Sequence, residues 1–412
     1  MPVSGEERIV RLAARGDGVT ASGRFFPLTA PGDLLAEDGA VLPGPHRRAP
    51  PCRHFPECGG CQLQHVDDSA YADYLAERIA SALSAQGLTA ADIRPAHISP
   101  PASRRRASLR AERRGKAVLL GFNAEASHRI VDMRECHVLR PELFALVAPL
   151  RDLLARLIGP RSNAGVRLTL ADQGVDVLLE KVEADGLEAA EALTAFAARH
   201  GLARLALDDG LGPQTRWEPE PVTVTLGGAP VPLPHGAFLQ ATAEGEAALV
   251  AAVRESVGEA RIVADLFAGL GTFALALEGR VLAVEGARDA ALALKAAAGR
   301  AQRQVFVDHR DLFRRPLMEA EAGRFEAIVL DPPRAGAREQ VAILAASPVP
   351  RIAYVSCNPA TFARDARTLV DGGYALDWVK PVGQFRWSTH VELVGAFSRG
   401  RESPAAPFPR GG

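Results

Sequence analysis

The spacing of hydrophobic and polar positions differs between three parts of the chain. Residues 1–45 hold short apolar runs between turn sequences such as Gly16-Asp17-Gly18, which is typical of short β-strands. After a proline-rich link, apolar residues recur at helical spacing between about residues 67 and 85. We therefore predict a small N-terminal β unit, as found in OB-like barrels, followed by an amphipathic helix.

The middle and the end of the chain differ in how strands and helices alternate. Strands are predicted at 108–111, 117–122, 166–170 and 175–181, with helices at 141–158 and 187–200. This predicts an α+β central domain. Beyond about residue 234, strands at 262–267, 280–285, 304–307, 327–330, 351–356 and 393–398 are mostly separated by helical segments. Regular alternation of this kind predicts an α/β, doubly wound, mainly parallel sheet. The tail, residues 401–412, has a disordered composition.

Composition narrows the function classes. The chain has 412 residues, 47% hydrophobic and 24% charged, and a formal net charge of −1. A protein that coats nucleic acid through global basicity is therefore excluded, and any RNA surface must be a local patch. No uncharged apolar run reaches about 18 residues, and the N-terminus is charged where a signal peptide is apolar. We expect a cytoplasmic protein with no membrane span.

A local basic patch is present at 103–116. It contains Arg104, Arg105, Arg106, Arg110, Arg113, Arg114 and Lys116 against the single acid Glu112. Such a strip can neutralise RNA phosphates, although it can also be a solvated face. Phe238, Phe385 and Trp387 are candidates for stacking on bases, with burial in the core as the alternative.

Cysteines indicate a metal site. Cys52, Cys58 and Cys61 lie within ten residues, with Gly59-Gly60 between the last two, and Cys136 is the only other cysteine before the C-terminal domain. Four thiolates suit an iron–sulfur cluster or a structural zinc. The uneven spacing favours iron–sulfur over zinc, and free buried thiols are a third interpretation. His54 and His65 are then ordinary neighbours, because four cysteines suffice.

A cofactor pocket is predicted where Asp265-Leu-Phe-Ala-Gly269-Leu-Gly271-Thr272 follows an apolar strand. Glu285 ends the next strand, where a carboxylate can accept both ribose hydroxyls, and Asp311 follows the third strand within reach of an adenine amino group. The turn lacks the third glycine of a dinucleotide site. Asp265 can pair with an ammonium but repels a phosphate, which favours S-adenosylmethionine over NAD. Ordinary surface carboxylates remain the alternative for Glu285 and Asp311.

A nucleophile is predicted at Cys357, because Ser356-Cys357-Asn358-Pro359 follows a strand at the ligand-binding edge of the sheet. A buried structural thiol is the alternative. A methyl donor beside a thiol suits carbon 5 of a pyrimidine, which becomes nucleophilic only after a thiolate adds at carbon 6. Glu392 is the candidate base that removes the carbon 5 proton, with His390 as alternative. Asp331 can hydrogen-bond the uracil or the cofactor.

Several motifs together resemble one family. They are Cys52…Cys58-Gly-Gly-Cys61-Gln…His65, Phe238-Leu-Gln240, Asp265-Leu-Phe267, Asp331-Pro-Pro-Arg-Ala-Gly336 and Ser356-Cys357-Asn-Pro-Ala-Thr361. From about residue 5 to 399 the chain resembles the RNA 5-methyluridine methyltransferases, in particular the bacterial iron–sulfur branch acting on 23S ribosomal RNA.

The resemblance implies a Rossmann-like S-adenosylmethionine-dependent methyltransferase. It implies a 4Fe-4S cluster on Cys52, Cys58, Cys61 and Cys136, a cofactor site at Gln240, Phe267, Gly269, Gly271, Thr272, Glu285, Asp311 and Asp331, and Cys357 and Glu392 as nucleophile and base. The expected divisions are a shortened TRAM-like unit (1–45), the cysteine segment with its helix (46–92), the central RNA-binding domain (93–235), the methyltransferase domain (236–400) and the tail.

The chain departs from the family at a few positions. Thr272, Asp311 and Thr242 replace frequent asparagines, and the loop before the base reads Gln384-Phe-Arg-Trp387. The expected partner is RNA, most simply 23S ribosomal RNA with a flipped or single-stranded uridine, bound by a monomer. The alternatives are uracil-5 methylation of the transfer RNA T-loop, a non-catalytic iron–sulfur RNA-binding protein, and a cytosine-5 enzyme, which is disfavoured because those usually carry a Pro-Cys pair.

Overall fold

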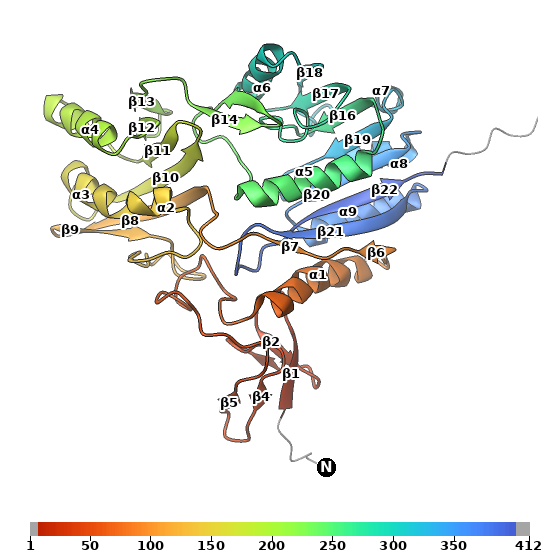
Figure 1. Cartoon of the computed structure of the whole chain (residues 1–412), viewed down its shortest axis with the longest axis horizontal. Coiled ribbons are helices and arrows are strands. Elements are labelled where there is room, and N and C mark those ends of the chain that lie inside the picture. Colours follow the sequence, from red (N-terminus) through yellow and green to blue (C-terminus); the bar gives the residue numbers. More distant parts are fainter. Residues whose placement is uncertain (1–6, 401–412) are drawn as a thin grey trace, which may run out of the picture.

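The computed structural model describes residues 7–400, so the predicted disordered tail at 401–412 lies outside the described residues. Its described part contains three larger sheets and one two-stranded hairpin (Figure 1). No helix within 7–400 is long and apolar enough to cross a bilayer.

The N-terminal sheet has five short antiparallel strands in the order β3-β2-β1-β4-β5. They are β1 Glu7–Leu12, β2 Gly18–Thr20, β3 Phe25–Phe26, β4 Leu34–Leu35 and β5 Val41–Leu42. The buried Asp33 carboxylate accepts hydrogen bonds from the amides of Ala30 and Gly44 and pairs with Arg47 at 2.6 Å. This joins the small sheet to the segment that leads into the cysteines.

The predicted helix after the cysteines is α1 (Asp68–Ser84). Its N-cap Asp67 accepts a hydrogen bond from Ala70, and Tyr71, Leu75, Ile79 and Leu83 are among its buried residues. Through this apolar face α1 contacts the C-terminal sheet and its helix α9 (Pro359–Asp371), as Figure 1 shows. An element near the N-terminus thus completes the core of the C-terminal unit.

The central sheet has the order β13-β12-β11-β10-β8-β9. Its strands are β8 Arg106–Arg114, β9 Ala117–Gly121, β10 Asn163–Ala171, β11 Gly174–Glu180, β12 Arg204–Asp208 and β13 Gln214–Trp217, and its helices are α2 Pro141–Ala145, α3 Val147–Leu157 and α4 Leu187–Arg199. The helix predicted at 141–158 is split after Ala145. Pro149 lacks the N–H that would bond the carbonyl of Ala145, so the helix cannot run through unbroken.

The C-terminal sheet is mainly parallel, as predicted. Its order is β18-β17-β16-β19-β20-β22-β21-β6, with β7 also pairing with β21. Its strands are β6 Asp92–Ile93, β7 His97–Ile98, β16 Ile262–Leu266, β17 Arg280–Glu285, β18 Val305–His309, β19 Ala327–Leu330, β20 Arg351–Ser356, β21 Ala375–Gly383 and β22 Glu392–Ser398. Strands β22 and β20 are antiparallel, and so are β22 and β21. The edge strands β6 and β7 were not predicted, because two-residue strands carry no periodic signal.

Helices cover both faces of this sheet. Along β19, Ile328 and Leu330 enter the core shared with α1, α8 (Arg338–Ala346) and α9, while Val329 enters the core on the other side. That second core is covered by α5 (Ala243–Val257), α6 (Arg288–Arg300) and the hairpin of β14 (Thr223–Leu226) and β15 (Ala229–Pro232). The short α7 (Glu319–Ala322) lies at the edge of the first core. Because both faces are covered, the carboxyl ends of the parallel strands are left as the place for a site.

Candidate active site

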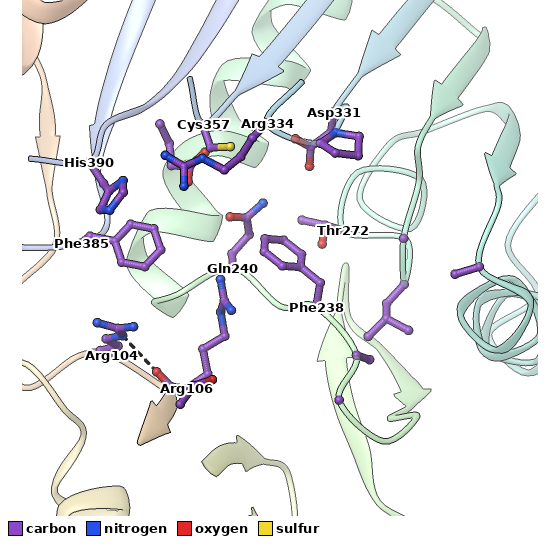
Figure 2. Close-up of a pocket in the computed structure, with 18 of the residues that line it drawn as sticks. Arg104, Arg106, Phe238, Gln240, Thr272, Asp331, Arg334, Cys357, Phe385 and His390 are labelled. Atoms are coloured by element: carbon purple, nitrogen blue, oxygen red, sulfur yellow. Dashed lines mark hydrogen bonds between the residues drawn. The ribbon is translucent and has the colours of Figure 1, made fainter. Parts of the chain in front are cut away.

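One large cavity, of about 1430 Å³, opens at the carboxyl ends of β16, β17, β19 and β20. Its other walls come from β8 of the central sheet, from residues 234–240 and from the loop between β21 and β22. Figure 2 shows Cys357, Arg334 and Asp331 along one side of this space, with Phe238, Gln240 and Arg106 facing them. Residues more than 250 positions apart in the chain therefore share one cavity.

Most of the predicted cofactor residues line this cavity. They are Gln240, Phe267, Gly269, Thr272, Glu285 and Asp331. The Glu285 carboxylate accepts hydrogen bonds from the amides of Gly269 at 2.7 Å and Ala287 at 2.6 Å. Two backbone donors thus fix this carboxylate at the end of β17, and its remaining lone pairs can accept hydroxyl groups.

Two predicted cofactor residues do not line the cavity. Gly271 has φ of +93°, and a Cβ there would lie 2.3 Å from Leu294, so this glycine serves the packing of the turn against α6. Asp311 is exposed, and its carboxylate accepts a 2.9 Å hydrogen bond from the amide of Phe313. The ring of Phe313 lies 5.4 Å from that of Phe267, which brings the Asp311 turn beside the cavity wall.

The interpretation of Asp265 as a direct partner of the cofactor differs from what the structure shows. Its side chain is completely buried, does not line the cavity, and accepts a 2.8 Å hydrogen bond from the amide of Ala274. Burial raises the pKa of this carboxyl to about 7, and the negative charge of Glu285 adds to the rise. Asp265 therefore supports the glycine turn from beneath.

Cys357 lies between the end of β20 and the start of α9. Asn358 is the N-cap of α9 and Pro359 its first residue, so the chain turns sharply just after the thiol. The Asn358 side chain donates a 3.1 Å hydrogen bond to the carbonyl of Arg334, and the Thr361 hydroxyl donates to the same oxygen at 3.2 Å. The two loops of the sheet edge are thereby held together.

The charges around Cys357 oppose its ionisation. Burial, together with the neighbouring acids Glu392 and Asp331, raises the pKa of the thiol to about 11 against the opposing effect of Arg334. Burial also raises the pKa of Asp331 well above its usual range, helped by Glu392 and Asp265. At neutral pH the thiol is protonated, so the arrangement requires a base to produce the thiolate.

Glu392, the predicted base, is buried at the start of β22 and lines the cavity. Burial raises its pKa to about 7, against the opposing effects of a hydrogen bond from Gln384 and the positive charges of Arg106 and Arg334. A carboxylate with this pKa is well suited to accept a proton near neutral pH. His390, the alternative base, lines the same cavity, and burial together with Arg334 and Arg104 lowers its pKa.

The basic strip divides according to the pleat of β8. Arg106, Ser108 and Arg110 line the cavity, whereas the intervening Ala107 and Leu109 are buried in the central core. Only part of the basic strip predicted at 103–116 therefore faces the cavity. Other arginines of the strip serve the fold: Arg105 pairs with Glu246 and donates to the carbonyl of Gln240 at 3.0 Å, Arg113 donates to the carbonyl of Ile158, and Arg114 pairs with Glu112.

Of the three candidate stacking residues, two line the cavity. Phe238 is 61% exposed, and the guanidinium of Arg106 lies 4.6 Å from its ring centre. Phe385 faces the same space, with Arg104 5.3 Å from its ring centre. Trp387 is only 6% exposed and packs against Cys61 and Val138, which is the core alternative.

The four cysteines line one small cavity next to the large one. Burial, together with the neighbouring Cys136, Cys58 and Cys52, raises the pKa of Cys61 to about 12. Within residues 7–400, no three His, Cys, Asp or Glu side chains meet at the spacing needed for one metal ion. Around a single zinc, thiolates would lie about 4 Å apart; a larger group such as an iron–sulfur cluster separates them more.

Gly59 and Gly60 form a tight turn between Cys58 and Cys61, closed by a hydrogen bond from the Cys61 amide to the Cys58 carbonyl at 3.4 Å. Neither glycine has positive φ, and a Cβ on Gly59 would lie 2.9 Å from the carbonyl of Asn123, whose oxygen accepts the Gly59 amide. His54 and His65 make hydrogen bonds or contacts with the backbone instead of joining the four cysteines. His54 accepts a hydrogen bond from the amide of Arg134 at 2.9 Å, and His65 contacts the carbonyl of Thr29 at 3.2 Å.

Sequence reasoning assigned no role to several residues of the large cavity. Arg334 was quoted only within the Asp331-Pro-Pro-Arg motif, and its position one loop from a strand end was a signal that could have placed it in the site. The segment 122–126 gave no such signal, because tertiary packing brings it to the cavity. The same holds for Gln384, which does not line the cavity but hydrogen-bonds Glu392.

Three comparisons place the chain among known proteins. The family model described as tRNA (uracil-5-)-methyltransferase matches residues 233–399. An uncharacterized RNA methyltransferase of Zymomonas mobilis is 56% identical over 395 residues, covering 95% of this chain and 100% of that protein. The 23S rRNA (uracil(1939)-C(5))-methyltransferase RlmD of Chromohalobacter salexigens is 34% identical, covering 85% of this chain and 76% of that protein.

A solved structure shares the whole fold. The Pyrococcus abyssi tRNA (uracil-54, C5)-methyltransferase in complex with S-adenosyl-L-homocysteine has a TM-score of 0.71 at 22% identity, covering 95% of this chain and 99% of that one.

Proposed function

The chain belongs to the S-adenosylmethionine-dependent RNA (uracil-5-)-methyltransferases, and from this we propose that it methylates carbon 5 of a uridine in 23S ribosomal RNA, with Cys357 as nucleophile and Glu392 as base. The observation that carries the proposal is that one cavity is lined by the Cys357 thiol, by a carboxyl of near-neutral pKa, and by the glycine turn with Glu285.

The cavity fits S-adenosylmethionine. Glu285 offers carboxylate lone pairs beside the glycine turn, Phe267 offers an apolar ring, and Thr272 and Gln240 offer polar groups. When bound, S-adenosylmethionine supplies an electrophilic methyl group on its sulfonium. Asp331 and Gln240 are proposed to lie between the cofactor and Cys357, where they can contact both the cofactor and the uracil ring.

The first step assigned to the protein is addition of Cys357 to carbon 6 of the uracil. The thiol proton passes to the Glu392 carboxylate and from there to solvent, which returns Glu392 to its carboxylate form for the last step, and a carbon–sulfur bond forms as the ring electrons shift toward the carbonyl oxygen at carbon 4. Arg334 stabilises the negative charge of thiolate and ring, since its guanidinium lowers the pKa of Cys357. Asp331, whose pKa is raised, is neutral and can donate a hydrogen bond to the uracil edge.

The last step assigned to the protein is elimination. Once carbon 5 carries the methyl group, Glu392 removes its remaining proton, the bond from carbon 6 to sulfur breaks, and Cys357 leaves as the thiolate. Because the pKa of Glu392 is about 7, its carboxylate form is substantially populated at neutral pH. His390 is the alternative acceptor of this proton.

The RNA is proposed to enter between β8 and the sheet edge. Arg106 and Arg110 line that wall, and within residues 7–400 Arg106 has no carboxylate within ion-pair distance, which leaves its charge available to a phosphate. Phe238 offers an exposed ring for stacking. A uridine must leave its stack to bring carbon 6 to Cys357, so a flipped or single-stranded base is expected.

Ribosomal rather than transfer RNA is favoured by the relatives. The RlmD protein that shares 34% identity acts, by its name, on 23S rRNA, whereas the transfer RNA enzyme of known structure shares 22% and supports the fold alone. The transfer RNA T-loop is the alternative that the experiment below distinguishes.

We further propose that Cys52, Cys58, Cys61 and Cys136 hold a 4Fe-4S cluster. The donor set is four thiols around one cavity, which is the number of cysteine ligands that a 4Fe-4S cluster takes.

The proposed division of the chain follows from these sites. Residues 1–45 form a shortened TRAM-like RNA-binding unit, 46–92 the cysteine segment, 93–235 the central RNA-binding domain and 236–400 the methyltransferase. Support for the first comes from the five-stranded sheet over 7–42. The helix α1 and strands β6 and β7 pack with the methyltransferase sheet, so the cysteine segment is anchored on the catalytic unit.

The test is to map 5-methyluridine in ribosomal and transfer RNA from a strain lacking the gene. The expected result is loss at one or more 23S positions, restored by the wild-type chain and not by Cys357→Ser. Loss confined to the T-loop would replace the proposed substrate, and unchanged 5-methyluridine in every RNA would refute the proposed activity.

A further inference from the structure

The loop between β21 and β22, residues 384–391, lies between the two cavities. On one side Phe385, Ser388 and His390 line the large cavity, and Glu392 follows directly at the start of β22. On the other side Trp387 packs against Cys61, Val138 and the partly buried Cys136. The segment that leads to the proposed base is therefore also a wall of the four-cysteine site.

Backbone contacts fix this loop to the cysteine segment. The carbonyl of Trp387 accepts hydrogen bonds from the amides of Gln62 and Leu63, both at 2.8 Å, directly after Cys61. Trp387 itself has φ of +60°, a left-handed conformation that a bulky residue keeps only where neighbours impose it. The packing against Cys61 and the two amides supply that constraint.

A third contact comes from α1, the helix that follows the cysteines. The Tyr71 hydroxyl is completely buried and lies 3.2 Å from the carbonyl of Phe385 and 3.0 Å from that of Ser388. The loop is thus fastened at Phe385, Trp387 and Ser388 by residues 62–71.

Arg104 connects the two cavities from the opposite side. Its amide donates a 2.9 Å hydrogen bond to the carbonyl of Val138, which packs with Cys61 and Trp387, and its guanidinium lies 5.3 Å from the ring centre of Phe385. A change of charge or spacing among the sulfurs would act on Phe385 through this stacking contact.

None of the four cysteines lines the large cavity. A group held by them therefore reaches the reacting atoms only through other residues. This favours a positioning role over direct participation in chemistry.

We propose that the four-cysteine site is a clamp for the loop 384–391, with Trp387 and Arg104 as the positioning residues that transmit its order to Phe385 and Glu392. The inference rests on the proposed function for the roles of Glu392 and the cysteines. The coupling itself is a property of the folded chain and can be measured without substrate.

Amide hydrogen exchange on the full, anaerobically purified chain tests the clamp. Trp387→Ala and Cys61→Ser are each expected to speed exchange at least about tenfold at Ser388 and His390, and Trp387→Ala also at Gln62 and Leu63, while the glycine turn at 265–272 stays unchanged. Trp387→Phe, which keeps a large ring against Cys61, should restore near-normal protection. Trp378→Phe is the matched control, because Trp378 is buried in β21 and packs in the core on the sheet face opposite α1.

Kinetics provide a second readout. Trp387→Ala is expected to lower kcat about 10- to 100-fold and to shift the pH midpoint set by Glu392, with S-adenosylmethionine affinity within about twofold of normal. Unchanged exchange at 384–391 in either Trp387→Ala or Cys61→Ser would overturn the clamp. If Trp387→Ala fails to fold, Trp387→Leu in the same exchange experiment decides the question.

The two proposals fail in different ways. Faster exchange at 384–391 in a protein that methylates no uridine would leave the clamp standing and refute the proposed function. Normal methylation by Cys61→Ser with unaltered exchange would refute the clamp alone.

Discussion

The side-chain amide of Gln384 donates a 2.7 Å hydrogen bond to the amide oxygen of Gln240. The side-chain oxygen of Gln384 accepts a 2.7 Å hydrogen bond from the amide of Ala241, and the Gln384 side chain also hydrogen-bonds Glu392. The cofactor side of the cavity and the proposed base are thus joined through one buried side chain of the β21–β22 loop.

This relationship predicts the pH dependence of the reaction. A base acts as its carboxylate, so kcat should rise as pH increases through about 7, the pKa of Glu392. The Gln384 hydrogen bond lowers that pKa, so Gln384→Ala should move the midpoint upward by about one pH unit, equivalent to about 1.4 kcal/mol. Arg106→Gln should move it in the same direction, because Arg106 also lowers the pKa. Single-turnover rates from pH 5.5 to 9 measure both; a downward or absent shift would contradict the assignment of Glu392.

Removing the base should stop the reaction after methyl transfer. Glu392→Gln keeps the shape of the side chain but cannot take the carbon 5 proton, so a methylated RNA bonded to Cys357 should accumulate and survive denaturing gel electrophoresis. His390→Gln serves as the comparison. If the adduct accumulates with His390→Gln and not with Glu392→Gln, the base is His390.

Removing the nucleophile should abolish catalysis without emptying the cofactor site. Cys357→Ala should lower methyl transfer by at least about 10³-fold, whereas calorimetry should show S-adenosylmethionine binding within about twofold of normal. Transcripts containing 5-fluorouracil should crosslink to the wild-type chain and fail to crosslink to the variant. Residual turnover close to the wild-type rate would exclude Cys357 as nucleophile.

The four-cysteine site makes an analytical prediction. Protein purified without oxygen should be brown and contain about four irons per chain, and Cys136→Ser should lose most of the iron. Metal analysis by mass spectrometry distinguishes this from zinc. One zinc per colourless chain would show that the site is a structural zinc site.

RNA binding should depend on the cavity side of β8. Arg110 is exposed and lines the cavity, so Arg110→Gln should reduce the salt dependence of RNA binding by about 0.7–0.9 in the slope of log K against log salt. Arg367→Gln is the matched control, since Arg367 lies on α9 and pairs with Asp371. Equal effects of both substitutions would show that Arg110 has no special contact with RNA.

The large elements of the fold were predictable because their periodicity is local. The strands β16, β17, β19, β20 and β22 follow the predicted apolar runs within one or two residues. The sequence did not predict the short strands β6 and β7, because two residues carry no periodic signal. It also did not predict the break between α2 and α3, which Pro149 causes.

Site residues that directly follow a parallel strand could be predicted from the sequence. Gly269, Glu285, Asp331 and Cys357 all lie at or just beyond the carboxyl ends of parallel strands, which meet at one edge of the sheet. Gly271 and Asp265 belong to the same sequence motif, yet neither lines the cavity. Gly271 packs against Leu294 of α6, and the buried Asp265 accepts a hydrogen bond from the amide of Ala274.

The sequence by itself determined the order of strands and helices and therefore which motifs gather at the edge of the sheet, since periodicity and turn residues act over short stretches of chain. Only the tertiary structure decided that Arg106 faces Glu392 while Arg105 pairs with Glu246, that Trp387 packs on Cys61, and that the thiol of Cys357 is protonated at rest. Burial and the distance between charges set these properties, and both depend on segments that lie far apart in the chain.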